Sequence, residues 1–338
     1  MTAQSTPPGG AETGHAAGGG SGHGGGTTAI LAALGANLGI AVAKFIAFVV
    51  TGASSMLAEA IHSVADSANQ VLLLVGGRRA GRAATRQHQF GYGRDRYIYA
   101  FIVSIVLFSV GGLFAVYEGV HKLQHPEALT SPAWAIGVLV VAIALEGFSL
   151  RTAVKETQEV KSAEDSYWDF IRHARAPELP VVLLEDTAAL LGLVLALLGV
   201  GLSVLTGKAV FDGIGTVAIG LLLIVVAVIL GVETKSLLVG ESATPEDQRK
   251  IVAALEGDGA GVSLIHMRTL HLGPEELLVA AKIAVDHDDT AAAVARAIDE
   301  AEERVRAAVP IARVIYLEPD LRRDTGPSAT EASAVERP

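Results

Sequence analysis

Long apolar segments dominate the first two thirds of the chain. Each is about as long as a helix that crosses a bilayer, which needs roughly 20 residues. Only four or five residues join the first two segments and the last two, so we expect antiparallel neighbours there. The segments span residues 28–50, 56–77, 97–121, 132–153, 180–205 and 210–232. This pattern predicts an all-α transmembrane domain of six helices over residues 28–235.

The periodicity changes after residue 240. Amphipathic helical spacing alternates there with the two-residue alternation of strands, and Thr244 is a suitable N-cap for the first helix. The elements expected are a helix at 245–255, strands at 262–272 and 276–285, a helix at 290–309 and a strand at 311–317. This order predicts a small α+β domain over residues 240–320.

Composition agrees with a membrane protein. Hydrophobic residues make up 51% of the chain and charged residues only 18%. The absence of cysteine excludes disulfides, thiolate metal sites and cysteine nucleophiles. The net charge of −10 argues against a nucleic-acid partner. Residues 1–27, rich in Gly and His but without Lys or Arg, are expected to form a disordered tail rather than a signal peptide, and residues 321–338 a second disordered tail.

Basic residues predict the orientation. They are concentrated between the second and third segments and between the fourth and fifth, whereas the opposite connections hold only Lys122 and Lys208. Cytoplasmic loops carry the excess of Lys and Arg. Both termini and the α+β domain are therefore expected in the cytoplasm, with the helices in the cell's inner or plasma membrane.

Ionisable residues inside the apolar segments are the candidates for chemistry, since each costs about 2.5–3.5 kcal/mol or more in hydrocarbon. In the second segment His62 and Asp66 are four residues apart and so lie one turn apart on one helix face. Asn69 lies on the same face. An imidazole and a carboxylate in this arrangement suit a divalent cation such as Zn²⁺. The alternative is a buried His–Asp hydrogen bond that fixes helix packing.

The fifth segment adds two adjacent carboxylates, Glu185 and Asp186. Neighbouring helical residues point about 100° apart, so only one of them can aim squarely at His62 and Asp66. The other is expected to face a neighbouring helix, bond a hydroxyl or carry a proton. Together these residues predict a metal site of three or four N/O ligands that water can complete. Zinc is the first candidate, and Mn²⁺, Fe²⁺, Co²⁺, Ni²⁺ and Cd²⁺ remain alternatives.

Other polar residues within the segments have less defined roles. Glu146 is interpreted as a second-shell group, a proton relay or a helix–helix hydrogen-bond partner. Asn37 and Asp212 are expected to serve packing and capping. Lys44 is expected to extend its stem to the membrane interface, and Glu59, near the outer end of its helix, to be hydrated.

Several motifs resemble one known family. Residues 55–70, Ser-Met-Leu-Ala-Glu-Ala-Ile-His-Ser-Val-Ala-Asp-Ser-Ala-Asn-Gln, resemble the second-helix signature of the cation diffusion facilitators, the zinc-transporter solute carriers. Phe-Gly-Tyr-Gly at 90–93 is similar to the family's motif before the third helix. Residues 145–147 and 184–192 look most like a subgroup that includes a mitochondrial zinc exporter of animals. The resemblance covers about residues 28–320.

The resemblance implies cation export coupled to proton entry by a homodimer, and it implies that the α+β domain is ferredoxin-like. It also implies ligand pairs four residues apart in the second and fifth helices. His62 and Asp66 match the first pair, and Asp186 matches one member of the second. The other position is Val182, which cannot bind a metal. Either Glu185 compensates or the site has three protein ligands.

Two accessory metal sites of the family look degraded here. In the loop before the third segment His88 remains, but Tyr92 stands where a second His is expected. In the α+β domain His266 and Glu318 occupy ligand positions, whereas Ala281 and Tyr316 fall where other His are expected. These positions are therefore expected to bind metal only weakly.

The hypothesis is a secondary-active transporter in which protons compete with the metal for His62, Asp66 and Asp186. An intramembrane metalloenzyme is the first rival, but no HExxH pair or activated nucleophile is present in the sequence. A non-transporting membrane metal sensor or scaffold that keeps this fold is the alternative function.

Overall fold

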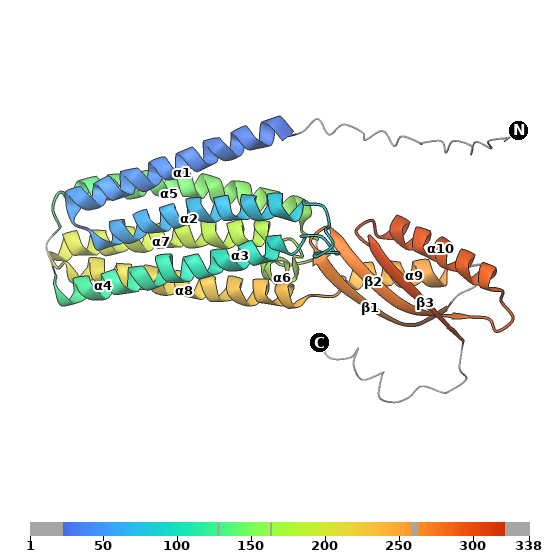
Figure 1. Ribbon diagram of the computed structural model, residues 1–338. Helices are drawn as coiled ribbons and strands as arrows, with labels where there is room; N and C mark the ends of the chain where they lie inside the picture. Colours follow the sequence, from blue (N-terminus) through green and yellow to red (C-terminus); the bar gives the residue numbers. More distant parts are fainter. Residues whose placement is uncertain (1–22, 127–128, 163, 258–262, 322–338) are drawn as a thin grey trace, which may run out of the picture.

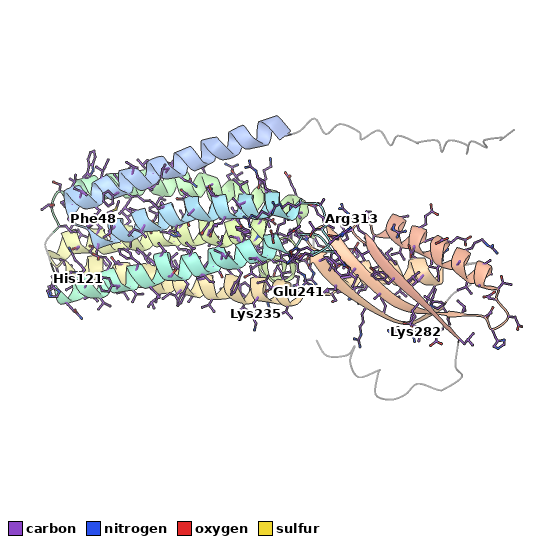
Figure 2. The ribbon with its side chains drawn as sticks, in the orientation of Figure 1. Phe48, His121, Lys235, Glu241, Lys282 and Arg313 are labelled. Carbon is purple, nitrogen blue, oxygen red and sulfur yellow. The ribbon has the colours of Figure 1, made fainter. Side chains whose placement is uncertain are left out.

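The computed structural model describes residues 23–126, 129–162, 164–257 and 263–321. It consists of a helix bundle, made of α1 to α8, and a sheet unit at one end of it (Figure 1). We call the end of the bundle next to the sheet the sheet-side end and the opposite end the distal end. Glu241 lies at the sheet-side end and His121 at the distal end (Figure 2).

The bundle contains a helix over each of the six apolar segments. Its elements are α1 (His23–Thr51), α2 (Ser54–Ala80), α3 (Asp95–Val106), the π-helix η1 (Leu107–Leu113), α4 (Phe114–Gln124), α5 (Pro132–Val160), α6 (Tyr167–His173), α7 (Glu178–Thr206) and α8 (Val210–Val239). Four stretches are long and apolar enough to cross a membrane: Asp95–Gln124, Pro132–Val160, Glu178–Thr206 and Val210–Val239. The part of α1 from Asn37 to Thr51 is apolar but shorter. Polar residues in the middle of α2 lower its hydropathy, so a crossing by α2 stays a prediction.

Two features of the helices differ from the sequence-based expectation: the residue at which α1 begins and the continuity of the third segment. Helix α1 begins at His23, inside the segment predicted to be a disordered tail. The rest of that tail and residues 322–338 lie outside the described residues. The third segment is interrupted by η1, which contains the adjacent glycines Gly111 and Gly112. Wide π turns are rare and occur as short insertions in α-helices.

Glycines allow the third segment to pack closely against α8. A Cβ atom on Gly220 of α8 would lie 2.6 Å from the Val116 backbone N and 2.9 Å from the Gly112 carbonyl oxygen. About one turn away along both helices, a Cβ atom on Gly119 would lie 2.7 Å from the Val217 backbone N. The backbones therefore touch where side chains would otherwise separate the helices.

Asp212 of α8 caps α2 at the distal end. Its carboxylate accepts hydrogen bonds from the backbone N and the hydroxyl of both Ser54 and Ser55. These amides begin α2 and have no partner within the helix. The predicted capping role is confirmed, although Asp212 caps a different helix from its own. This contact fixes the start of α2 against α8.

The sheet unit has its own apolar core. Its elements are α9 (Pro245–Glu256), β1 (Ser263–Gly273), β2 (Glu276–Val285), α10 (Ala291–Ala308) and β3 (Val314–Leu321). The strand order is β1-β2-β3, with β1 and β2 antiparallel and β2 and β3 parallel. The predicted order of helices and strands is confirmed, including the Thr244 cap of α9, whose side chain accepts from the Asp247 N. A ferredoxin-like domain stays a prediction.

Ion pairs link the sheet unit to the bundle. The guanidinium of Arg96 at the start of α3 lies 3.3 Å from the Glu178 carboxylate at the start of α7 and 3.4 Å from that of Glu275 in the β1–β2 turn. Arg175 pairs with Glu241, which follows α8. The backbone N of His271 in β1 donates to the Glu241 carbonyl oxygen at 2.9 Å. The sheet unit is therefore held against the ends of three bundle helices.

Candidate functional site

A small polar cavity of about 20 Å³ lies among four bundle helices. Its walls come from α1, α2, α5 and α7, which pack against one another as α1–α2, α2–α7, α7–α5 and α5–α1. The lining residues are Asn37, Ser63, Asp66, Gln70, Glu146, Ser149, Val182, Glu185 and Asp186. Four of the nine are carboxylates: the predicted ligands Asp66, Glu185 and Asp186, and Glu146, which was predicted to assist them.

Helix α2 supplies Asp66 and, behind it, His62. The His62 Nδ1 lies 3.4 Å from the Asp66 Oδ1, as expected for residues four apart on a helix. His62 is only 1% exposed and does not line the cavity itself. In the part of the chain that is described, neither ring nitrogen makes a hydrogen bond. The His62–Asp66 packing bond considered in the sequence analysis is therefore not formed, and the imidazole keeps its lone pair available.

Helix α7 directs its two adjacent carboxylates to different neighbours. Glu185 accepts a hydrogen bond of 2.7 Å from the Asn69 amide, which draws it toward α2. Asp186 accepts one of 2.8 Å from the Ser149 hydroxyl of α5. The two side chains thus diverge as helical geometry requires. Glu185 faces α2, and Asp186 bonds a hydroxyl, which was one of the roles expected for the second carboxylate.

Helix α5 contributes Glu146 to the same cavity. The carboxylates of Asp66, Glu146, Glu185 and Asp186 therefore surround one small volume. No Lys or Arg in the described ranges forms an ion pair with any of them. Glu185 and Asp186 accept the hydrogen bonds described above, whereas the Asp66 Oδ1 has no hydrogen-bond partner among the described residues, which is unfavourable inside an apolar bundle. The cavity is thus suited to protons or to a cation.

The predicted ligands do not form a closed coordination site in this conformation. Within the described residues, no group of three or more His, Asp or Glu side chains is close enough to hold a metal ion. Asp66, Glu185 and Asp186 share the cavity, and His62 reaches it through Asp66. Val182 also lines the cavity, at the position four residues before Asp186 where the family resemblance implies a ligand. Bringing the oxygens and the imidazole onto one ion requires a local movement.

Two residues have roles that the sequence did not indicate. Lys44 does not extend to the membrane interface, and Glu59 is not hydrated, because both side chains are fully buried. The Lys44 Nζ lies 3.1 Å from the Glu59 Oε2 and donates a 2.8 Å hydrogen bond to the Ser63 hydroxyl. A buried ammonium keeps its charge only beside a carboxylate. Glu59 is three residues from His62, a spacing that could have indicated a shared helix face.

The predicted accessory positions are separate from the cavity. His88 is exposed and contacts Tyr92, with 3.1 Å between the Tyr92 hydroxyl and the His88 Nδ1. His266 and Glu318 line one groove on the exposed face of the sheet. Glu318 pairs there with Lys282 at 3.2 Å. Weak metal binding at these positions stays a prediction.

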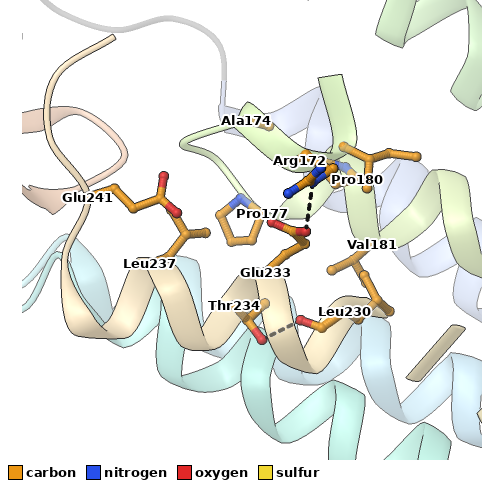
Figure 3. A pocket seen from close by; sticks show the side chains of 11 residues that line it. Arg172, Ala174, Pro177, Pro180, Val181, Leu230, Glu233, Thr234, Leu237 and Glu241 are labelled. Carbon is orange, nitrogen blue, oxygen red and sulfur yellow. Dashed lines mark hydrogen bonds and ion pairs between the residues drawn. The ribbon is translucent and has the colours of Figure 1, made fainter. Parts of the chain in front are cut away.

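Another small pocket lies between α6, α7 and α8 at the sheet-side end (Figure 3). Arg172 points toward Glu233, with 3.7 Å between the guanidinium and the carboxylate. The Thr234 hydroxyl donates to the Leu230 carbonyl oxygen at 2.6 Å. Its ionisable residues are already paired and its other walls are mainly apolar, so this pocket offers no set of metal ligands.

Known proteins share this sequence pattern. Residues 30–239 match the family model of the cation efflux transmembrane domain. The mitochondrial proton-coupled zinc antiporter SLC30A9 of Xenopus laevis is 33% identical over 244 residues, 72% of this chain and 44% of that protein. Metal tolerance protein C4 of Arabidopsis thaliana is 28% identical over 256 residues, 75% of this chain and 56% of that protein. The cation-efflux pump FieF of Serratia proteamaculans is 27% identical over 236 residues, 70% and 73% respectively. The chain thus spans less than half the length of SLC30A9.

Proposed function

Because the chain belongs to the cation efflux family and is an integral, multi-pass membrane protein, we propose that it transports a divalent transition-metal cation through the cavity between α1, α2, α5 and α7. It acts as a secondary-active transporter and not as an enzyme. Zinc is the preferred substrate in this proposal, and protons are the counter-ion. The names of the SLC30A9 relatives, which describe proton-coupled zinc antiport, support both assignments.

One observation carries the proposal: four carboxylates face one buried cavity and none is paired with a Lys or Arg of the described chain. Unpaired carboxylates are costly in a low-dielectric interior. Intramembrane carboxylates and imidazoles mark ion pathways and proton relays. A bound dication balances two of the charges, and protons balance them when it leaves.

The donor types favour zinc. His62 offers a neutral imidazole, and Asp66, Glu185 and Asp186 offer oxygens, a mixed set that suits a borderline cation. Metal and protons compete for the same lone pairs. His62 is the natural proton carrier, since the ordinary pKa of imidazole is the nearest of these groups to neutral pH. Glu146 and Asn69 orient the ligands or relay protons.

The transport cycle alternates access to the cavity between the two ends of the bundle. The chain ends and the sheet unit face the cytoplasm, consistent with the basic loops at the sheet-side end. The cation then leaves the cytoplasm as protons enter. The sheet unit assembles two copies of the chain into a homodimer, which places its exposed sheet face in contact with a partner.

The central experiment measures metal-dependent proton flux in proteoliposomes. The flux should disappear in His62→Ala and in Asp186→Ala. Glu185→Gln keeps the oxygen that bonds Asn69 but removes the charge, so it tests whether Glu185 is a ligand. The matched control is His287→Ala, which removes an exposed imidazole of the sheet unit and should leave the flux unchanged.

Flux that persists in both the His62 and the Asp186 variants refutes the site. Metal binding by the purified protein without any accumulation in vesicles would instead favour the alternative of a non-transporting sensor or scaffold. Competition among Zn²⁺, Mn²⁺, Fe²⁺, Co²⁺, Ni²⁺ and Cd²⁺ in the same assay identifies the substrate. Chemical cross-linking in the membrane tests the homodimer.

A further inference from the structure

A buried ion pair lies between the carboxylate cavity and the distal end of the bundle. The Lys44 ammonium of α1 contacts the Glu59 carboxylate of α2 at 3.1 Å and the Ser63 hydroxyl at 2.8 Å. Both charged side chains are 0% exposed. Ser63 also lines the cavity, so the pair forms part of the boundary on this side. The pair joins α1 and α2 on the distal side of the predicted ligands.

The pair also reaches α7. A Cβ atom on Gly192 would lie 2.7 Å from the Glu59 Oε1, so this oxygen packs directly against the α7 backbone. The same oxygen makes no hydrogen bond with any described residue. Three of the four helices that surround the cavity therefore meet at one ion pair. A residue larger than glycine at this position of α7 would displace the carboxylate.

Positions along the helices place the pair on the distal side of the ligands. Helix α2 starts at Ser54 at the distal end, so Glu59 precedes Asp66 by seven residues, or about 10 Å at the rise of an α-helix. Lys44 lies a similar distance before the distal end of α1 at Thr51. Met56, between Glu59 and the distal end of α2, is fully buried. The cavity is thus closed on this side.

The sheet-side half of the cavity is less enclosed. Gln70 and Asp186 are only partly buried, and Ser149 is exposed. The lining residues on the side away from Lys44 are therefore more accessible than Ser63, which is buried. An ion pair, unlike an apolar plug, can separate into two hydrated groups when the helices part.

We propose that the Lys44–Glu59 ion pair is the distal gate of the transport pathway. The pair is formed while the cavity is accessible from the sheet-side end and broken while it is accessible from the distal end. Lys44 and Glu59 are positioning residues, since they hold α1, α2 and α7 together without binding the cation. This inference rests on the proposed transport function and adds the element that separates its two states.

The chain contains no cysteine, which permits a direct test of access. Val182→Cys puts a single thiol on the cavity wall, and a chelator is present throughout so that this thiol does not bind metal. The protein is reconstituted, and a membrane-impermeant thiol reagent is added to one side at a time. With Lys44 and Glu59 intact, the thiol should react from the sheet-side end and be protected from the distal end.

The gate is then opened by removing one partner, with Glu59→Gln in the Val182→Cys chain, because the closed state then buries the Lys44 ammonium without a carboxylate. The distal labelling rate should rise about tenfold or more, which corresponds to about 1.4 kcal/mol in a two-state equilibrium. Lys44→Arg keeps the charge and should retain protection. A sheet-side labelling rate equal to that of the parent, together with an unchanged melting temperature, reports that each variant is folded.

A matched control uses another buried lysine. Lys122 is only 6% exposed at the distal end, where its Nζ donates to the Gly52 carbonyl oxygen at 2.9 Å. Lys122→Met should leave distal labelling slow. The gate assignment is overturned if Glu59→Gln labels from the distal side as slowly as the parent, or if Lys122→Met accelerates labelling equally. Labelling needs no metal, so these outcomes are independent of the flux assay on His62 and Asp186.

Discussion

The close packing of the third segment against α8 gives a quantitative prediction. In Gly220→Ala the new Cβ would lie 2.6 Å from the Val116 backbone N and 2.9 Å from the Gly112 carbonyl oxygen. Backbone atoms cannot rotate away, so α8 must move outward. Overpacking of this kind costs about 1–3 kcal/mol, whereas replacing a helical Gly by Ala returns about 1 kcal/mol. We therefore expect a net loss of up to about 2 kcal/mol.

The assay measures the thermal stability of the detergent-solubilised protein as the fraction that remains folded after heating. A domain of 150–250 residues shifts its melting temperature by about 2–4 °C per kcal/mol, so the expected decrease is several degrees. The control is Gly201→Ala in α7, where a Cβ atom would meet nothing within 4 Å. This variant should melt at the parent temperature or above it. A Gly220→Ala protein as stable as the Gly201→Ala protein would refute the close backbone contact.

Two further predictions concern other buried polar groups. Asp212→Ala removes the cap of α2 and leaves the Ser54 and Ser55 donors without their acceptor. It should therefore lower the free energy of unfolding by about 1–3 kcal/mol, as measured in the same melting assay. An unchanged melting temperature would contradict the capping role. Burial lowers the pKa of His271 below its ordinary value of 6.5, so below that pH the unfolded chain binds more protons than the folded protein and stability falls on acidification. His271→Asn should therefore reduce the decrease in melting temperature between about pH 7.5 and about pH 5. The control His287→Asn, which changes an exposed ring, should not reduce it. A decrease in His271→Asn as large as in the parent would count against this reasoning.

The sequence predicted the elements well because hydrophobic periodicity is a local property. Five of the six apolar segments each lie within one helix, the third spans α3, η1 and α4, and Thr244 caps α9 as expected. The last strand was placed too early, at 311–317 instead of Val314–Leu321. The apolar signal there began with Ile311, which packs against the core of the sheet unit before the strand begins, and its carbonyl oxygen accepts from the Leu277 N.

The site was predictable only as far as single helices determine it. The spacing of His62 and Asp66 fixed their contact, and the 100° rotation per residue separated Glu185 from Asp186. Which carboxylate faces α2 depends on how α7 is rotated in the bundle, and no local pattern contains that information. The interpretation of Lys44 was wrong for the same reason. Its partner lies 15 residues away on another helix, so the ion pair exists only once α1 and α2 have packed.

The position of Arg96 limits how the sheet unit and α7 can move. One guanidinium touches Glu178, the first residue of α7, and Glu275 in the turn between β1 and β2. Glu275 is 71% exposed, so its contact adds little stability by itself. A single planar group nevertheless cannot follow two carboxylates in different directions. Any displacement of the hairpin therefore either pulls on the helix that begins seven residues before Glu185 or releases it.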